Sequence, residues 1–141
     1  MNKSLTLNGN IKTILLVEDD VDDQDFIIEA LLEIDDQLTI HTVSNGNKAL
    51  PFLEALPDDQ LPQLLILDYN LPELDGPEVL QQLQNPRYEP MVKIVWSTSN
   101  APQYKARCLE LGATFYLVKP STITGIAAMA SQMLQVCEST A

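Results

Sequence analysis

The sequence predicts an α/β protein, a doubly wound domain in which helices cover both faces of a five-stranded parallel sheet. Short aliphatic or β-branched runs alternate with longer amphipathic segments over most of the 141 residues, which is the pattern of successive βα units. Several of the short runs are apolar throughout, as expected of strands buried on both faces. No linker rich in serine or glycine and no internal repeat interrupts the alternation, so we expect one domain.

The expected strands are short runs that stop abruptly at polar residues. The first and the third, residues 14–17 and 64–67, are apolar throughout and run directly into Glu18 and Asp68. The fourth closes on Ser97 and the fifth on Lys119. In chain order, we expect strands at residues 14–17, 38–43, 64–67, 92–96 and 114–118.

The segments between these strands have the apolar spacing of amphipathic helices. In the first of them, apolar residues recur at positions 26, 27, 30, 31 and 34, and the acidic residues before them suit the positive end of a helix dipole. Pro51 and Pro77 are expected in first turns, where a missing N–H is tolerated, and Gly112 is expected to end the fourth helix. The expected helices span about residues 22–34, 48–56, 77–84, 103–111 and 122–136.

The chain is strongly acidic, with 20 acidic and 8 basic residues and a formal net charge of −12 at pH 7. Such a charge repels nucleic-acid phosphates and anionic lipid, so we expect no nucleic acid and no membrane as a partner. No apolar run has the length of a signal peptide near the N-terminus or of a membrane span elsewhere. We therefore expect a cytoplasmic protein with an N-terminal tail at 1–12, one domain at 13–137 and a C-terminal tail at 138–141.

Residues able to carry chemistry follow four of the five expected strands: Glu18 with Asp19, then Asp68, then Ser97, then Lys119. The carboxyl ends of parallel strands meet at one edge of a sheet, where ligands bind in open α/β folds. Each residue alone has an ordinary explanation, as a helix cap, a turn residue, a strand-end hydroxyl or a surface lysine. Their joint occurrence at four strand ends favours a functional site.

The three carboxylates of this set indicate a metal. Without a counter-ion they would raise one another's pKa values and resist ionisation. Oxygen ligands without histidine or cysteine suit a hard ion such as Mg²⁺ rather than Zn²⁺. A metal of this kind bridges a carboxylate and a phosphoryl oxygen in phosphoryl transfer, so the sequence indicates transfer of a phosphoryl group onto an aspartate. The other acids between residues 20 and 25, Asp23 included, are interpreted as a solvated helix start and not as ligands.

Four segments resemble the receiver domain of two-component response regulators: residues 14–20 (ILLVEDD), 67–76 (LDYNLPELDG), 95–97 (VWS) and 112–120 (GATFYLVKP). Their order and spacing match from about residue 14 to residue 134. The chain is most similar to the small, stand-alone response regulators of bacteriophytochromes and hybrid histidine kinases. The resemblance implies a flavodoxin-like fold with strand order 2-1-3-4-5.

The resemblance also implies a role for each residue around the acceptor. Asp68 would take the phosphoryl group from a phosphohistidine of a partner kinase. Asp19 would bind Mg²⁺ directly, as would Asp68, and Glu18 would act mostly through metal-bound water. The backbone carbonyl of Asn70 would complete the protein's share of the ligands.

A second group of residues would respond to the phosphate. Lys119 would pair with one phosphoryl oxygen, and the hydroxyl of Ser97, with Thr98 beside it, would bond another. Tyr116 occupies the position of an aromatic switch that turns inward when this hydroxyl moves, although an ordinary strand aromatic packed on a helix is the alternative. The peptide bond between Lys119 and Pro120 is a candidate for the cis form.

These observations predict a signalling switch and not an enzyme acting on a separate metabolite. With no room for an output domain in 141 residues, we expect the signal to pass to a partner protein, by self-association through the fourth helix, fifth strand and fifth helix, or by phosphorelay. One alternative is a receiver-like interaction module that is not phosphorylated. Another is an aspartyl-phosphate hydrolase, but Asn70 stands where such enzymes need a second aspartate.

Overall fold

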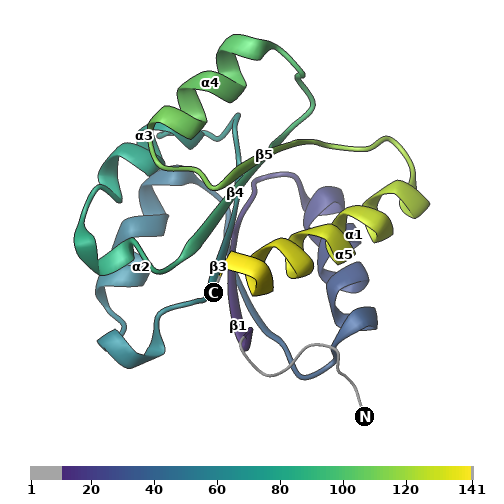
Figure 1. The fold of residues 1–141 in the computed structure, drawn as a ribbon, viewed down its shortest axis with the longest axis horizontal. Helices are drawn as coiled ribbons and strands as arrows, with labels where there is room; N and C mark the ends of the chain where they lie inside the picture. The colour runs from purple at the N-terminus through teal and green to yellow at the C-terminus, as the bar shows by residue number, and fades with distance from the viewer. Residues whose placement is uncertain (1–10, 141) are drawn as a thin grey trace.

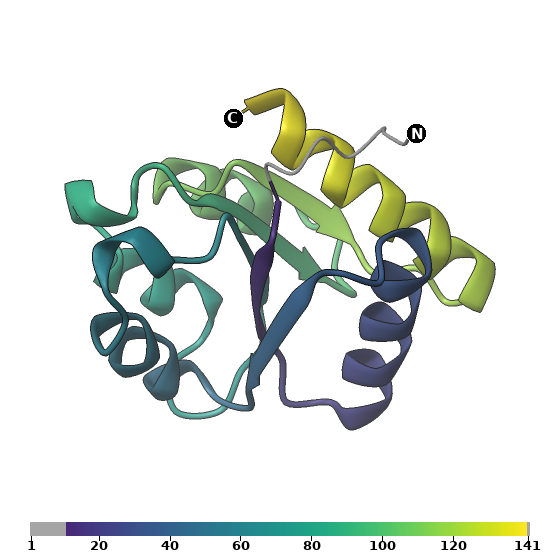
Figure 2. The ribbon, with the colours of Figure 1, turned by 90° about the horizontal axis from the view of Figure 1, so that it is seen from below.

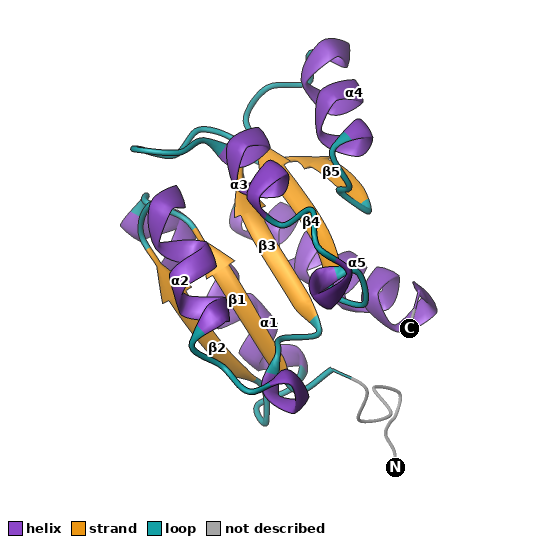
Figure 3. Ribbon diagram, turned by 90° about the vertical axis from the view of Figure 1, so that its left-hand side faces the viewer, coloured by secondary structure: helices purple, strands orange, loops and turns teal. Residues whose placement is uncertain are grey.

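The structure is a computed structural model that describes residues 11–140. Its parallel sheet contains, in chain order, β1 (Thr13–Val17), β2 (Thr39–Val43), β3 (Leu64–Asp68), β4 (Val92–Ser97) and β5 (Phe115–Val118). The spatial order is β2-β1-β3-β4-β5, with β2 and β5 at the two edges (Figure 3). The predicted flavodoxin-like fold with strand order 2-1-3-4-5 is therefore confirmed.

Helices cover both faces of the sheet (Figures 1 and 2). α1 (Val21–Ile34) and α5 (Ile123–Thr140) pack side by side on one face, and the other is covered by α2 (Ala49–Glu54), α3 (Gly76–Gln82) and α4 (Pro102–Glu110). The winding direction reverses between β1 and β3, because the chain first moves outward to β2 and then returns to the far side of β1. Ligand sites in open α/β sheets lie at this reversal. Within residues 11–140, no helix combines the length and apolar composition needed to cross a bilayer.

The strands supply two separate hydrophobic cores, because successive side chains of a strand point to opposite faces. The core beneath α1 and α5 contains the strand residues Ile14, Leu16, Ile66, Ile94 and Trp96. The core beneath α2, α3 and α4 contains Leu15, Val17, Leu65, Leu67 and Val95. Burial on both faces explains why these strands are apolar throughout in the sequence.

Most element boundaries lie within one or two residues of the predicted ones, but the second helix differs. The predicted helix at 48–56 consists of a 3₁₀ turn, η1 (Gly46–Lys48), followed by the short α2, with Pro51 in the first turn of α2 as expected. Two further 3₁₀ turns, η2 (Asp58–Gln60) and η3 (Pro86–Tyr88), were not predicted. A single turn is too short to show apolar periodicity in a sequence.

Residues on the outer side of both predicted boundaries are part of the folded structure. Most of the expected N-terminal tail, residues 1–10, lies outside the described residues. Ile11 is buried in the core beneath α1 and α5, and the carbonyl of Lys12 accepts a 2.8 Å hydrogen bond from the amide of Thr39. At the other end, α5 continues to Thr140, through residues 138–140 that were expected to be a tail. Cys137 is buried in the same core, which anchors the last turns of α5.

Candidate functional site

Two acidic residues lie directly after β1, at the carboxyl edge of the sheet. The amide of Glu18 donates to the carbonyl of Val43 at 3.1 Å, which keeps the chain extended beyond β1. Asp20 then caps α1, because its side chain accepts a 2.9 Å hydrogen bond from the amide of Asp23. This local structure leaves Glu18 fully buried and Asp19 exposed.

Asp68 is the last residue of β3 and is 5% exposed. Its Oδ1 accepts a 3.3 Å hydrogen bond from the amide of Asn70, which turns the chain after the strand. At the start of α3 the loop returns to the same point, so closely that a Cβ on Gly76 would lie 2.8 Å from the carbonyl oxygen of Asp68. Glycine alone permits this approach, and the loop thereby holds the Asp68 backbone in place.

Glu18, Asp19 and Asp68 form a cluster in which carboxylate oxygens lie within 4.8 Å of one another. Within the described residues, Glu18 Oε1 is buried and forms no hydrogen bond, and its close cation is the Lys119 ammonium at 3.0 Å. That ammonium is shared with two further carboxylates, so it compensates this buried oxygen only in part, and a second cation would complete the compensation. Three oxygen donors without sulfur or imidazole suit a hard divalent ion. The residues of the cluster therefore fit a divalent metal of the kind that the sequence indicated.

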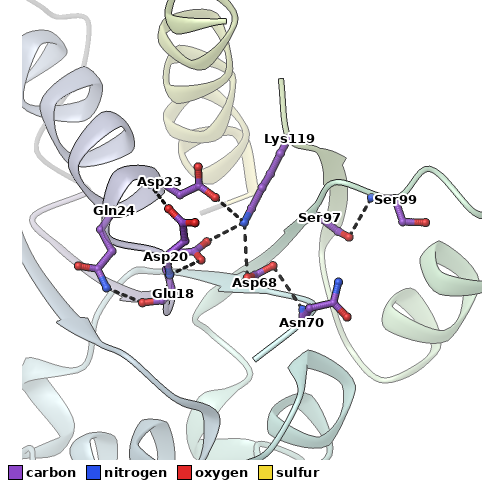
Figure 4. Close-up of polar contacts among 9 residues, drawn as sticks. All are labelled: Glu18, Asp20, Asp23, Gln24, Asp68, Asn70, Ser97, Ser99 and Lys119. Carbon is purple, nitrogen blue, oxygen red and sulfur yellow. Dashed lines mark hydrogen bonds and ion pairs between the residues drawn. The ribbon is translucent and has the colours of Figure 1, made fainter. Parts of the chain in front are cut away.

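The ammonium group of Lys119 lies among three carboxylates (Figure 4). Its Nζ is 2.9 Å from Asp23 Oδ2, 3.0 Å from Glu18 Oε1 and 3.4 Å from Asp68 Oδ2. Of these three ion pairs, the one to Asp23 also has hydrogen-bond geometry. Lys119 can reach the cluster because its amide donates to the carbonyl of Ser97 at 2.7 Å, which continues the pairing of β4 and β5 to their ends.

Burial has the largest effect on the acidic groups of the site. Burial and then the charge of Asp68 raise the pKa of Glu18 to about 7, although Lys119 opposes both. Burial likewise raises the pKa of Asp68, and Lys119 again opposes it. For Lys119 itself, burial lowers the pKa, but the hydrogen bond to Asp23 and the charges of Asp68 and Glu18 outweigh burial and raise it overall. One ammonium group does not balance these carboxylates, so a further cation would stabilise their charged forms.

Ser97 and Tyr116 are connected through Ser99. Ser97 is fully buried at the end of β4, and its hydroxyl oxygen accepts a 3.1 Å hydrogen bond from the amide of Ser99 (Figure 4). The carbonyl of Ser99 accepts a 2.7 Å hydrogen bond from the hydroxyl of Tyr116, whose ring is already buried. Thr98, between them, is exposed. The loop after β4 thus links the predicted hydroxyl residue to the predicted aromatic switch.

One sequence prediction at this edge is wrong and another is not tested. No peptide bond within residues 11–140 is cis, so the bond between Lys119 and Pro120 is trans. The trans form is the intrinsically preferred one before proline, and Lys119 reaches the three carboxylates with it. The role of the Asn70 carbonyl stays a prediction, because the contact seen at Asn70 is made by its amide.

The contacts of two residues with Lys119 were not predicted from the sequence. Asp23 was interpreted as part of a solvated helix start, yet its carboxylate bonds the Lys119 ammonium. Trp96 was recognised only as the residue before Ser97, whereas the centroid of its ring lies 4.8 Å from Lys119 Nζ. The available signal was their position: Asp23 lies in the first turn of α1, and Trp96 directly precedes Ser97, so both are at the carboxyl edge of the sheet.

Comparison with known proteins matches the chain to one family. The family model described as the response regulator receiver domain matches residues 14–131. The two-component response regulator ORR7 of Oryza sativa subsp. japonica is 31% identical over 110 residues, which are 77% of this chain and 50% of ORR7. The chain therefore spans about half the length of this relative.

Two solved structures are similar over most of the chain. The phosphorylated cyanobacterial phytochrome response regulator RcpA has a TM-score of 0.83 and 29% identity, covering 93% of this chain and 96% of RcpA. The Mn²⁺-bound form of the response regulator Rcp1 has a TM-score of 0.76 and 30% identity, covering 86% of this chain and 90% of Rcp1. The family match over residues 14–131 includes the strand ends that form the site.

Proposed function

The chain belongs to the family of response regulator receiver domains, and from this premise we propose that it accepts a phosphoryl group on Asp68 in a Mg²⁺-dependent reaction. One observation carries the proposal: Asp68 lies in a carboxylate cluster with Glu18 and Asp19, and the Lys119 ammonium is 3.4 Å from its Oδ2. A nucleophilic carboxylate, a cation site and a fixed positive charge are the parts that phosphoryl transfer needs. The phosphorylated RcpA and the Mn²⁺-bound Rcp1 support this assignment.

Asp68 acts as the nucleophile. One of its carboxylate oxygens bonds to phosphorus while the bond from phosphorus to a histidine nitrogen of the partner kinase breaks, and the imidazole leaves. The carboxylates of Glu18, Asp19 and Asp68 and the backbone carbonyl of Asn70 would hold Mg²⁺, which would neutralise the charge of the phosphoryl group. Lys119 stabilises the same charge, because its ammonium is already beside the acceptor oxygen.

The signal leaves the site through the loop after β4. Ser97 exchanges its hydrogen bond from Ser99 for one to a phosphoryl oxygen. Because the carbonyl of Ser99 is bonded by Tyr116, a shift of this loop alters the environment of Tyr116 on β5 and the start of α4. The phosphate charge is thereby converted into a change of loop and side-chain positions.

The partners follow from this role. Receiver domains work with kinases in two-component systems, so a histidine kinase or hybrid kinase is the donor. The readout is a downstream protein, a second copy of the chain or a phosphorelay. Exposed apolar side chains on α4, β5 and α5 support an interface there: Leu109, Phe115, Val118 and Ile123. The net charge of −12 favours a protein partner over nucleic acid.

The proposal is tested by incubating the protein with acetyl phosphate, with and without Mg²⁺, and measuring its intact mass. We expect a single phosphoryl adduct that requires Mg²⁺ and that Asp68→Asn abolishes. Asp59→Asn is the matched control and should leave the adduct unchanged, because it removes an exposed carboxylate in η2, before β3 begins and so away from the carboxyl edge of the sheet. A wild-type protein that gains no phosphoryl mass would overturn the proposal and favour an interaction module without phosphorylation, whereas steady turnover of small phosphate esters would favour a hydrolase.

Trp96 provides an independent optical measurement. Its ring is 1% exposed and faces the Lys119 ammonium at 4.8 Å, so a change of charge at the site should alter its fluorescence. We expect a saturable change with Mg²⁺ and a further change with beryllofluoride, a phosphate mimic. Unchanged emission at saturation with both would contradict the geometry that we assign to the site.

A further inference from the structure

The ion pairs of Lys119 are of two kinds. Glu18 and Asp68 belong to the carboxylate cluster that fits a metal, whereas Asp23 does not. Asp23 is nevertheless the nearest partner, at 2.9 Å, and the one whose contact has hydrogen-bond geometry. A cation bound by the cluster would compete with Lys119 for two of its three partners and leave the third unaffected.

Asp23 is held firmly enough to act as a fixed partner. It lies in the first turn of α1, and its amide donates to the N-cap side chain of Asp20 at 2.9 Å. Its own side chain is 30% exposed, so the carboxylate reaches the buried ammonium of Lys119 from the solvent side. A backbone fixed by a helix cap and a side chain aimed at Lys119 restrict the positions open to the ammonium (Figure 4).

The ring of Trp96 restricts the ammonium further. Trp96 is buried beneath α1 and α5, and its centroid is 4.8 Å from Lys119 Nζ. A cation above an indole face is attracted to it, most strongly where water is excluded. The Lys119 side chain is 9% exposed, so water is largely excluded here. The ammonium therefore contacts both the Asp23 carboxylate and an aromatic ring, beside the acceptor.

We propose that Asp23 is a positioning residue for Lys119: its carboxylate, with the Trp96 ring, keeps the ammonium beside Asp68 when a cation occupies the carboxylate cluster. The inference rests on the proposed function, since it concerns the rate at which Asp68 takes up a phosphoryl group. A purely structural role would instead be the favourable interaction of an acidic residue with the N-terminus of α1. Asp22, its neighbour in the same turn, is exposed and has the same charge. Replacing Asp22 therefore tests the interaction with the helix terminus alone, whereas replacing Asp23 tests that interaction together with the contact to Lys119.

The first test compares rates of adduct formation from acetyl phosphate at saturating Mg²⁺. We expect Asp23→Ala to slow phosphorylation about tenfold, the loss typical of one charge-assisted hydrogen bond. Asp23→Asn keeps an acceptor oxygen but loses the charge, and we expect it to be slowed about threefold. Asp22→Ala should stay within about twofold of wild type, because it removes the same charge from the helix end. Equal rates for Asp23→Ala and Asp22→Ala would overturn the inference.

The second test needs no phosphate and no metal. The thermal stabilities of wild type, Asp23→Ala, Lys119→Gln and the double variant are measured in the presence of a chelator. We expect Asp23→Ala to lower the thermal stability clearly less in the Lys119→Gln background than in wild type, because the ammonium that Asp23 bonds is then already absent. An unchanged loss would show that Asp23 acts through the helix alone and would also overturn the inference. If wild-type protein forms no phosphoryl adduct, the proposed function is refuted. The comparison of the four thermal stabilities would still decide whether Asp23 acts through Lys119.

Discussion

Two lysines with largely buried side chains lie at opposite ends of the sheet, and their surroundings differ in kind. Lys93, near the amino end of β4, is 8% exposed and donates to the carbonyls of Tyr88 at 2.6 Å and Met91 at 3.1 Å. Within residues 11–140 it has no carboxylate at ion-pair distance, and burial lowers its pKa, with Glu89 opposing. Lys119, at the carboxyl end of β5, faces three carboxylates.

The difference separates a charge that backbone carbonyls satisfy from the charge to which we assign a function. Lys93 has fixed neutral acceptors, so its hydrogen bonds are satisfied by one arrangement of the chain. Lys119 carries one positive charge and faces three carboxylates. A second cation at this end of the sheet would therefore stabilise the charged carboxylates and raise the stability of the folded protein. Burial raises the pKa values of both Glu18 and Asp68, and the charge of Asp68 raises that of Glu18 further; shifted pKa values of this kind cluster at functional sites.

The largest expected effect comes from removing each lysine in turn. Lys119→Met leaves Glu18 and Asp68 buried without their counter-ion, and we expect the free energy of unfolding at about pH 8 without Mg²⁺ to fall by about 3 kcal/mol. Lys93→Met removes hydrogen bonds to two carbonyls but also removes a buried charge, and we expect a loss of about 1 kcal/mol. Urea denaturation of the two variants measures both values. Equal losses would mean that the two lysines do not differ as described.

The next effect is a dependence of stability on pH. The pKa of Glu18 in the folded protein is raised from 4.5 to about 7, so folding favours its protonated form. The contribution of Glu18 to the free energy of unfolding is fully present at a pH below its pKa in the unfolded chain. This contribution is lost as the pH rises through its pKa in the folded protein. Without Mg²⁺ we expect stability to fall by about 2 kcal/mol between about pH 5 and pH 8, and the raised pKa of Asp68 acts in the same direction.

Glu18→Gln provides the control for this pH dependence. The variant has no carboxyl group to titrate at this position, so its stability should change much less over the same range. Thermal unfolding of both proteins in a chelator, at several pH values, measures the difference. Parallel curves for wild type and Glu18→Gln would exclude Glu18 as the source.

The smallest expected effect is stabilisation by the metal. At Mg²⁺ concentrations several times its Kd, we expect the folded state to gain about 1 kcal/mol, because the ion binds folded and not unfolded chains. Asp19→Asn should abolish most of this gain, whereas Asp22→Asn, which removes an equal charge outside the cluster, should preserve it. Calorimetric titration with Mg²⁺ and thermal unfolding measure both. A gain that survives Asp19→Asn would place the ion elsewhere.

Much of the site was predictable because it follows from strand ends. The apolar runs before Glu18, Asp68, Ser97 and Lys119 are long enough to be recognised as strands, and parallel strands bring their carboxyl ends to one edge. The role of Asp23 was not predictable in this way. Several acids follow β1 within one helical turn, and the sequence does not show which of them points toward a lysine that lies 96 positions further along the chain.

The sequence by itself determined the fold, the strand order implied by its family resemblance, and the group of residues at the carboxyl edge. The fold class and the residue group depend on periodicity and on local turn chemistry, which neighbouring residues encode, whereas the strand order came from the resemblance. Only the tertiary structure decided that Lys119 bonds Asp23 and lies over Trp96, that Ser97 is turned toward Ser99, and that the bond before Pro120 is trans. Such contacts depend on how α1 packs against the sheet and on side-chain rotamers, which long-range packing selects.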